Sequence, residues 1–300
     1  MSIEVQDVKK YYGHQAALNG VNFSVKKGEV VGFLGPNGAG KSTMMKIITC
    51  YLPPSSGNVS VAGIDIYKDP LKIRKQVGYL PETNALYPEM YIREYLRYVA
   101  GLYHLPKKKE KVDEVIEQVG LQPEAHKQIG QLSKGYRQRV GLAQAIIHDP
   151  EVLILDEPTS GLDPNQLDDI RKLIKKLGKD KTVLVSTHIM QEVEAMCSRV
   201  IIIKSGKLVA DSPVKELTDG NNRATIFLKV SAPLPIEQIK ALAGVERVEL
   251  VSNYMYRIVA DGSKEINPAL NQIARSQGVN VEELRREARN LESIFRNLTK

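Results

Sequence analysis

The chain has 300 residues, 42% of them hydrophobic, which suits one large domain plus a smaller one. Its two cysteines, Cys50 and Cys197, lie in no metal-binding or paired spacing, so two reduced thiols are expected rather than a disulfide framework or a zinc site. The net charge of +7 is spread evenly, since residues 220–300 hold 12 Lys/Arg against 9 Asp/Glu, and no nucleic-acid partner is expected.

No segment predicts membrane insertion. The longest apolar runs, such as Val152 to Leu155 and Val200 to Ile203, are far shorter than the roughly 20 residues of a spanning helix. The first residues alternate like a strand and lack the basic-then-apolar layout of a secretory signal. We therefore expect a cytoplasmic protein that reaches the membrane only through a partner.

The first two thirds of the chain alternate between strand and helix patterns. Strands are predicted at residues 2–9, 21–26, 30–34, 152–155, 182–186 and 199–203, and residues 91–150 are predicted as a helical insertion. Strands alternating with helices indicate an α/β fold around a parallel sheet. The polar residues 211–222 are predicted as a linker, which gives one domain at 1–219 and another at 220–300.

The second domain alternates in the order βαββαβ, which predicts a small α+β domain of ferredoxin-like topology. An amphipathic segment formed by Leu291, Ile294, Phe295 and Leu298 is expected to pack back onto a domain surface. No catalytic or metal-binding constellation occurs in this domain, so a role in interaction or dimer stabilisation is favoured over ligand sensing.

A phosphate-binding loop follows the strand at residues 30–34. The pattern GxxxxGK[ST] stands directly between that strand and a helical run, which is the context that a Walker A motif requires. Its backbone N–H groups and the helix N-terminus can surround phosphates, while the lysine adds a positive charge and the serine a ligand for Mg²⁺. The predicted residues are Gly35, Pro36, Asn37, Gly38, Ala39, Gly40, Lys41, Ser42 and Thr43.

Two adjacent carboxylates, Asp156 and Glu157, end the apolar strand at 152–155 as in a Walker B segment. Asp156 can hold Mg²⁺ and Glu157 can polarise an attacking water. Alone, the pair would be equally compatible with a solvated strand end. Together with the phosphate loop it predicts an NTPase of the P-loop class, with ATP and Mg²⁺ as ligands.

Three further segments narrow the class. Leu132-Ser133-Lys134-Gly135-Tyr136-Arg137-Gln138 precedes the carboxylates, Ser160-Gly161-Leu162-Asp163 follows them, and His188 follows the next strand. In these motifs and their order, residues 1–219 resemble the ATP-binding cassette (ABC) ATPase family, a mixed sheet with a helical subdomain. The LSKGYRQ form is similar to the family's LSGGQ signature as found in ABC-2-type exporters.

The resemblance implies a role for each matching position. Ser133 and Gly135 would bind the γ-phosphate of ATP held by a second subunit, which requires a head-to-tail dimer, either a homodimer or a pair with a second ATPase subunit. Asp163 matches a loop that communicates between the two sites, and His188 matches a histidine that contacts the γ-phosphate. Tyr12 matches an aromatic residue that stacks on adenine, although Tyr11 is an alternative.

Glu82 departs from the family pattern. It stands where the family usually has glutamine, in Gly78-Tyr79-Leu80-Pro81-Glu82. A carboxylate there can still bind Mg²⁺, but it adds negative charge beside the phosphates. Shortly after it, Tyr87, Tyr91, Tyr95 and Tyr98 are predicted to share one helical face, either as core packing or as part of a groove for a membrane subunit.

The resemblance implies an ATPase that drives export through separate integral membrane permease subunits. A soluble ABC ATPase, of the translation-factor or DNA-repair type, is the alternative. The chain has one cassette and no coiled-coil insertion, whereas the translation type usually has two cassettes and the repair type a long coiled coil. The cargo is not encoded in these motifs.

Overall fold

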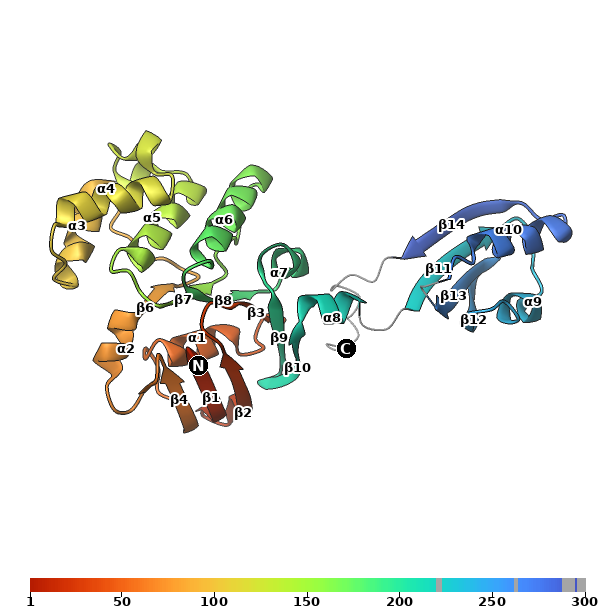
Figure 1. Cartoon of the computed structure of the whole chain (residues 1–300), viewed down its shortest axis with the longest axis horizontal. Coiled ribbons are helices and arrows are strands. Elements are labelled where there is room, and N and C mark those ends of the chain that lie inside the picture. Colours follow the sequence, from red (N-terminus) through yellow and green to blue (C-terminus); the bar gives the residue numbers. More distant parts are fainter. Residues whose placement is uncertain (220–222, 262–263, 288–294, 296–300) are drawn as a thin grey trace. The chain divides into compact units, whose positions relative to one another are not determined.

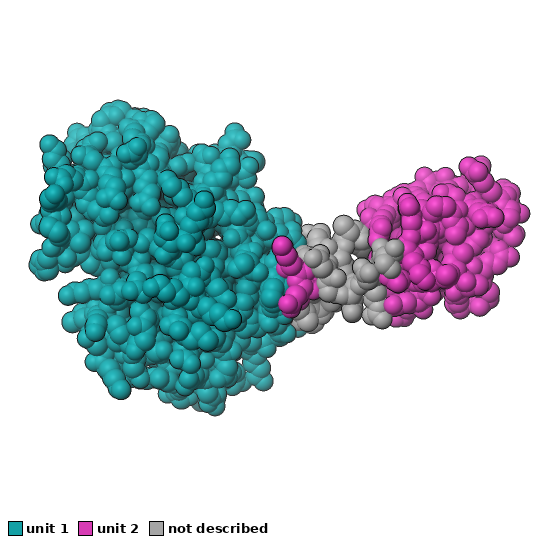
Figure 2. All heavy atoms as spheres, in the orientation of Figure 1, with its two compact units in different colours: residues 1–214, 299 teal, residues 215–298, 300 magenta. Residues whose placement is uncertain are grey.

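The computed structural model describes residues 1–219, 223–261, 264–287 and 295, and these form two compact units. The first unit takes in residues 1–214, and the second begins at Lys215 (Figure 2). The sequence placed this division between residues 219 and 220. The difference arises in the segment predicted as a linker, where strand β10 continues to Pro213 and helix α8 (Val214–Asp219) follows it.

The main sheet of the first unit has six strands in the order β10-β9-β3-β8-β7-β6. Neighbours from β9 to β6 are parallel, and β10 is antiparallel at one edge. Every residue of β7 and β8 is buried, as inner strands of a parallel sheet require. The strands are β3 (Val30–Leu34), β6 (Val77–Leu80), β7 (Val152–Asp156), β8 (Thr182–Thr187), β9 (Arg199–Lys204) and β10 (Lys207–Pro213).

A second, antiparallel sheet has the order β2-β1-β4-β5. Its strands are β1 (Ile3–Tyr12), β2 (Gln15–Val25), β4 (Ser56–Val61) and β5 (Ile64–Asp65). The first two are longer than predicted. Register shifts between Val5 and Tyr11 interrupt the apolar alternation on which the prediction depended, although the two strands stay paired as far as Tyr12 and Gln15.

The helices of the first unit lie on and beside the main sheet (Figure 1). They are α1 (Lys41–Ile48), α2 (Pro70–Gln76), α3 (Ile92–Leu102), α4 (Lys108–Gln118), α5 (Lys134–Ile146), α6 (Pro164–Leu177) and α7 (Met190–Met196), with 3₁₀ turns η1 (Gln122–Glu124) and η2 (Ile129–Gln131). Helices α3, α4 and α5 gather at one end of the unit, which confirms the predicted helical insertion. Among the described residues, no helix has both the length and the apolar character needed to span a membrane.

The second unit has the predicted βαββαβ order. Its elements are β11 (Arg223–Val230), α9 (Ile236–Lys240), β12 (Val245–Ser252), β13 (Met255–Asp261), α10 (Asn267–Ser276) and β14 (Val281–Glu287). The sheet order β12-β13-β11-β14, with antiparallel neighbours throughout, is the split-βαβ topology.

The core of the second unit is apolar apart from one buried tyrosine. The Tyr256 hydroxyl accepts a hydrogen bond from Leu234 N at 2.7 Å and donates one to Leu234 O at 3.1 Å, so its polar atom is satisfied. Of the tail predicted to pack on a domain surface, Leu291, Ile294 and Leu298 lie outside the described residues. Phe295 is described and is buried.

Candidate functional site

The glycine-rich loop, residues 35–43, curls between β3 and α1 because two glycines permit it. Gly40 has φ 109°, and a Cβ there would lie 2.6 Å from Ala17 O. A Cβ on Gly35 would lie 2.5 Å from Ile203 O. Only a residue without a side chain fits either position, so the chain can turn tightly enough to begin α1 at Lys41.

Lys41 is buried inside this curl. Its Nζ donates hydrogen bonds to Gly35 O at 2.8 Å and Pro36 O at 3.3 Å, and it lies 3.5 Å from Glu157 Oε1. Both members of the ion pair have side chains that are 7% exposed. A buried charge pair of this kind is costly to break, because either charge alone would remain in a low-dielectric setting.

The two carboxylates at the end of β7 are organised by Ser186 on β8. Ser186 Oγ donates a short hydrogen bond to Asp156 Oδ1, and Glu157 N donates to Ser186 O at 3.1 Å and to Ser186 Oγ at 3.2 Å. No sequence motif marks Ser186 as part of the site. Its position depends on the register that pairs Asp156 with Ser186, which no sequence pattern specifies.

Glu157 lies at the centre of the site, between Lys41 and His188. Its backbone has φ 50°, a left-handed conformation that is unusual for a residue other than glycine and is often found at functional sites. One carboxylate oxygen faces Lys41, and the other lies 2.9 Å from His188 Nδ1. Residues predicted at three separate motifs therefore meet around one carboxylate, which can accept a proton or orient a water molecule.

A cavity of about 530 Å³ opens above this cluster. It has the size of a small-molecule site. Its lining includes Tyr12 but not Tyr11, and it adds Gln15, Ala17 and Ser160 to the predicted set. The other lining residues are Asn37, Gly38, Gly40, Lys41, Ser42, Thr43, Glu82, Glu157 and His188.

Oxygen ligands suitable for Mg²⁺ lie in and beside the same cavity. Ser42 and Glu82 line it, whereas Asp156 is 1% exposed and is not among the lining residues. Mg²⁺ is typically bound by one or two carboxylates and completes its shell with water and substrate phosphate, so this donor set of two carboxylates and a hydroxyl fits the ion. Among the described residues, no cluster of three or more His, Cys, Asp and Glu side chains forms a metal cage of its own.

Three predicted residues lie elsewhere. Ser133 caps α5 by accepting a hydrogen bond from Tyr136 N at 3.4 Å, and Asp163 caps α6 by accepting one from Gln166 N at 3.0 Å. Gly135 packs tightly against Gln166, because a Cβ on the glycine would lie 2.4 Å from Gln166 Oε1. None of Ser133, Gly135 and Asp163 lines the cavity above Glu157.

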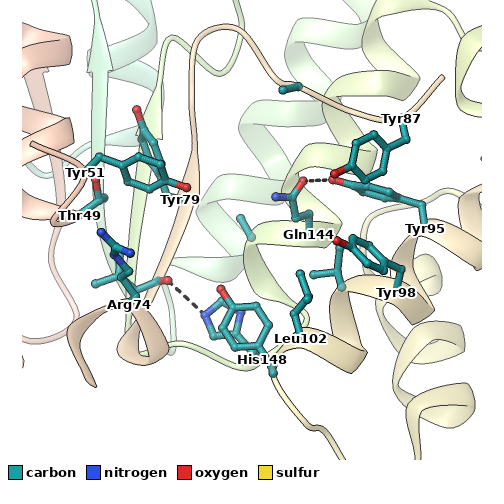
Figure 3. Close-up of a pocket in the computed structure, with 15 residues that line it drawn as sticks. Thr49, Tyr51, Arg74, Tyr79, Tyr87, Tyr95, Tyr98, Leu102, Gln144 and His148 are labelled. Carbon is teal, nitrogen blue, oxygen red and sulfur yellow. Dashed lines mark hydrogen bonds between the residues drawn. The ribbon is translucent and has the colours of Figure 1, made fainter. Parts of the chain in front are cut away.

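A second concave surface, the aromatic groove, lies beside α3 and α5 (Figure 3). The aromatic groove is a hollow of about 310 Å³ lined by Thr49, Tyr51, Arg74, Val77, Tyr79, Ala85, Tyr87, Tyr95, Tyr98, Val99, Leu102, Tyr103, Gln144, Ala145 and His148. Several of its apolar side chains face solvent: Tyr51 is 68% exposed and Leu102 is 60% exposed. Such an exposed apolar hollow is typical of an interaction site.

The predicted tyrosine face is only partly helical. Tyr95 and Tyr98 lie in α3, Tyr91 is its N-cap, and Tyr87 precedes it. Core packing holds for Tyr95 alone, which is 3% exposed and donates a hydrogen bond to Gln144 Oε1 at 2.5 Å. Tyr87 folds back so that its ring centroid lies 5.8 Å from that of Tyr95 and 6.0 Å from that of Tyr98.

His148 is one of the residues that line the aromatic groove. Its ring stacks on Tyr103 at 3.9 Å, and its Nε2 is 3.1 Å from Val77 O. Burial lowers the pKa of His148 from 6.5 to about 4. The ring is therefore neutral in the folded chain at neutral pH, which suits its position among aromatic side chains.

The chain is similar to known proteins in sequence. The family model described as ABC transporter matches residues 18–160. The linearmycin resistance ATP-binding protein LnrL of Bacillus subtilis (strain 168) is 34% identical over 304 residues, covering 99% of this chain and 98% of the relative. The bacitracin transport ATP-binding protein BcrA of Bacillus licheniformis is 39% identical over 227 residues, covering 75% of this chain and 74% of the relative.

Solved structures agree with these sequence relatives. The dimeric structure of MJ0796, a bacterial ABC transporter cassette, superposes with a TM-score of 0.65 at 30% identity, covering 70% of this chain and 98% of that one. A structure of an ATP-binding subunit of an ABC transporter gives a TM-score of 0.66 at 31% identity, covering 73% and 93%.

The lowered pKa of His148 predicts a pH-dependent stability. The unfolded chain binds a proton near pH 6.5 and the folded chain only near pH 4, so the stabilisation is complete above pH 6.5 and is lost as the pH falls toward 4. Replacing the ring by phenylalanine (His148→Phe) should reduce the loss of unfolding free energy between about pH 7 and about pH 5 by about 2 kcal/mol. Urea unfolding at the two pH values measures this loss.

The exposed His126 provides the matched control, and His126→Gln should retain the wild-type pH dependence. An unchanged pH dependence in His148→Phe would show that the folded chain takes up the proton as readily as the unfolded chain.

Proposed function

The chain belongs to the ABC transporter family as an ATP-binding and ATP-hydrolysing subunit, and we propose that two copies work head to tail to power export through separate membrane subunits. The observation that carries this proposal is that Lys41 and His188 both lie against the carboxylate of Glu157, beside the glycine-rich loop. The cavity above them, lined by that loop, has the size and the polar groups to hold a nucleotide.

The chemistry follows from the positions of these side chains. The ATP phosphates bind the N–H groups of the loop and the start of α1, where Lys41 supplies a positive charge. Because Lys41 lies 3.5 Å from Glu157, a phosphate that engages the lysine weakens its pairing with the carboxylate. Glu157 then orients a water molecule in line with the γ-phosphate. His188, which lies beside the other carboxylate oxygen of Glu157, contacts the same phosphate.

Mg²⁺ would be held by Ser42 and Asp156, with Glu82 as a further oxygen ligand at the edge of the cavity. Bound there, the ion neutralises charge on the phosphates during transfer. Glu82 brings more negative charge than the glutamine usual in the family. It also lines a neighbouring cavity, to which Lys134 and Arg137 of the signature segment contribute as well.

The positions of Ser133, Gly135 and Asp163, outside the nucleotide cavity of their own chain, support the dimer. Ser133 and Gly135 of the signature segment stand at the start of α5, and Asp163 of the loop after the carboxylates stands at the start of α6. None of the three lines the nucleotide cavity of its own chain. A helix N-terminus favours an anion, so the start of α5 can close over a nucleotide that a second copy holds. Two copies arranged head to tail would enclose two nucleotides, and MJ0796, a relative of the same fold, has been solved as a dimer.

Export is supported by the relatives. Their names describe linearmycin resistance, bacitracin transport and Nod factor export. A soluble ATPase of the translation or repair type is not favoured, because these relatives are transporter subunits. The subunit would therefore work on the inner face of the cell membrane, held there by its permease partners.

The aromatic groove is the surface that we assign to those partners. It combines exposed rings with a hollow beside α3, and its lining residues include Tyr79 and Ala85, which lie on either side of Glu82 in the sequence. A short segment of a membrane subunit that filled the hollow with an apolar side chain would cover Tyr87 and Tyr98, which are 48% and 45% exposed. Movement of that segment would reach Glu82 through Tyr79 and Ala85, which line the groove three residues before and after it.

Replacing the central carboxylate tests the ATPase. Glu157→Gln should lower steady-state ATP turnover on the order of 10²–10⁴-fold, because an amide cannot act as the base. It should also convert the purified chain into a dimer in size-exclusion chromatography with Mg-ATP, since the unhydrolysed nucleotide keeps the two copies closed. Glu151→Gln, an exposed change just before β7, serves as control. Persistent turnover without a dimer would refute both assignments.

A comparison of Tyr12 with its neighbour Tyr11 tests whether Tyr12 stacks on the adenine of ATP. Tyr12→Ala should weaken ATP affinity by about tenfold through loss of a stacking surface, and Tyr12→Phe should retain it. Tyr11→Ala is a matched control, because Tyr11 is 45% exposed but does not line the cavity. Calorimetric titration of ATP into Glu157→Gln backgrounds gives the affinities. Equal losses for Tyr11→Ala and Tyr12→Ala would contradict a specific role for Tyr12.

A charge placed in the aromatic groove tests the membrane partner. Tyr98→Glu should leave the ATPase rate of the isolated chain unchanged and should abolish its recovery with the permease subunits from detergent-solubilised membranes. Tyr67→Glu is the control, since Tyr67 is 58% exposed and lies outside the groove. Recovery of Tyr98→Glu at the wild-type level would show that the permease binds another surface.

A further inference from the structure

The sheet of the second unit has two edge strands, β12 and β14 (Figure 1). Within the described part of the chain, β12 pairs with β13 alone, so the backbone groups on its outer side meet no other strand. Such an edge can accept a further strand.

The two edges differ in composition. Within seven residues, β14 carries Glu282, Glu283, Arg285 and Arg286, a density of charge that discourages pairing. By contrast, β12 carries exposed apolar side chains near its end, where Leu250 is 56% exposed and Val251 is 54% exposed. The outer edge of β12 is therefore the better surface for association.

The middle of β12 places opposite charges on one face of the sheet. Arg247 and Glu249 are two residues apart and form an ion pair of 2.6 Å, and Glu249 also lies 3.6 Å from Arg257 on β13. Val248, between them, points to the other face and packs against the core cluster of the unit. Residues 247–250 form the regular part of the strand, since the register shifts lie on either side of them.

We propose that β12 pairs antiparallel with β12 of a second copy of this chain, across a two-fold axis at Val248. Residues directly opposite in an antiparallel pair point to the same face, and side chains alternate, so the axis must pass through a residue. With the axis at Val248, Arg247 of each copy lies opposite Glu249 of the other. An axis at Arg247 or at Glu249 would instead place like charges directly opposite each other, which is destabilising.

The pairing joins two four-stranded sheets into one continuous sheet with two cross-strand ion pairs. Each such pair contributes about 0.2–1 kcal/mol, which is too little to hold two free chains together. Two chains already joined through their ATPase units would raise the effective concentration of the edges to the millimolar range. In the cycle, which rests on the proposed function, the β12 edges would therefore pair while nucleotides or the permease subunits hold the two ATPase units together.

Cysteine cross-linking of the full-length chain tests the register. In a Cys50→Ser background, Val248→Cys should form covalent dimers under mild oxidation, because the two residues face each other across the axis. Arg247→Cys and Glu249→Cys are matched controls: like positions lie two residues apart along the strands, beyond the reach of a disulfide. Each should fail to cross-link alone, and a mixture of the two should cross-link. No cross-linking of Val248→Cys, or equal cross-linking of Arg247→Cys, would overturn the register.

Charge reversal tests the pairing independently of the cysteine geometry. Added to Val248→Cys, Arg247→Glu or Glu249→Arg should each lower the cross-linking yield about tenfold, because all facing charges become alike. Mixing the two charge variants should restore the yield, an outcome that misfolding cannot produce. If Val248→Cys itself unfolds, the same mixing test read by spin labels at Ser252→Cys replaces it, with a separation of about 27 Å expected across the axis.

The experiment separates this proposal from the proposed function. Cross-linking without an ATP-dependent dimer of Glu157→Gln would support the edge pairing and sink the nucleotide dimer. An ATP-dependent dimer whose Val248→Cys form gives no cross-link would support the nucleotide dimer and refute the pairing of β12 with β12.

Discussion

The pairing of the buried Glu157 carboxylate with Lys41 and His188 is the interaction on which the site of the first unit depends. Glu157 is 6% exposed, and its oxygens face Lys41 on one side and His188 on the other. A charge so far from solvent needs such partners. They can meet only because the loop after β3 and the ends of β7 and β8 emerge at the same edge of a parallel sheet, where the order β3-β8-β7 brings all three side by side. The sheet, the loop and the glycines at 35 and 40 together hold this one contact in place.

The surfaces left open by that arrangement are of three kinds. The nucleotide cavity is polar and built from backbone and charge. Seven of the fifteen residues that line the aromatic groove carry rings, and no second strand in the described part of the chain pairs with the outer side of β12. Each would suit the partner proposed for it: a phosphate ligand, an apolar segment of a membrane subunit, and a second strand of the same sequence.

Much of the fold could be predicted because its signals are local. The buried strands at 152–155 and 182–186 are continuous apolar runs, and the second unit alternates cleanly. Predictions failed where a tertiary contact overrode the pattern. Bulges interrupt β1, a helix forms in a segment that read as a linker, and Tyr87 reaches the rings of Tyr95 and Tyr98 from outside their helix.

By itself, the sequence determined the chemistry of the site: the glycine-rich loop, the lysine, the adjacent carboxylates and the order of the motifs are properties of residue type and spacing. Only the tertiary structure decided which atoms meet. Ser186 reaches Asp156 through the register of two parallel strands, Tyr12 rather than Tyr11 lines the cavity, and Ser133 stays outside it. The physical reason is that spacing along a chain specifies neighbours in sequence, whereas strand order and register bring together residues from distant segments.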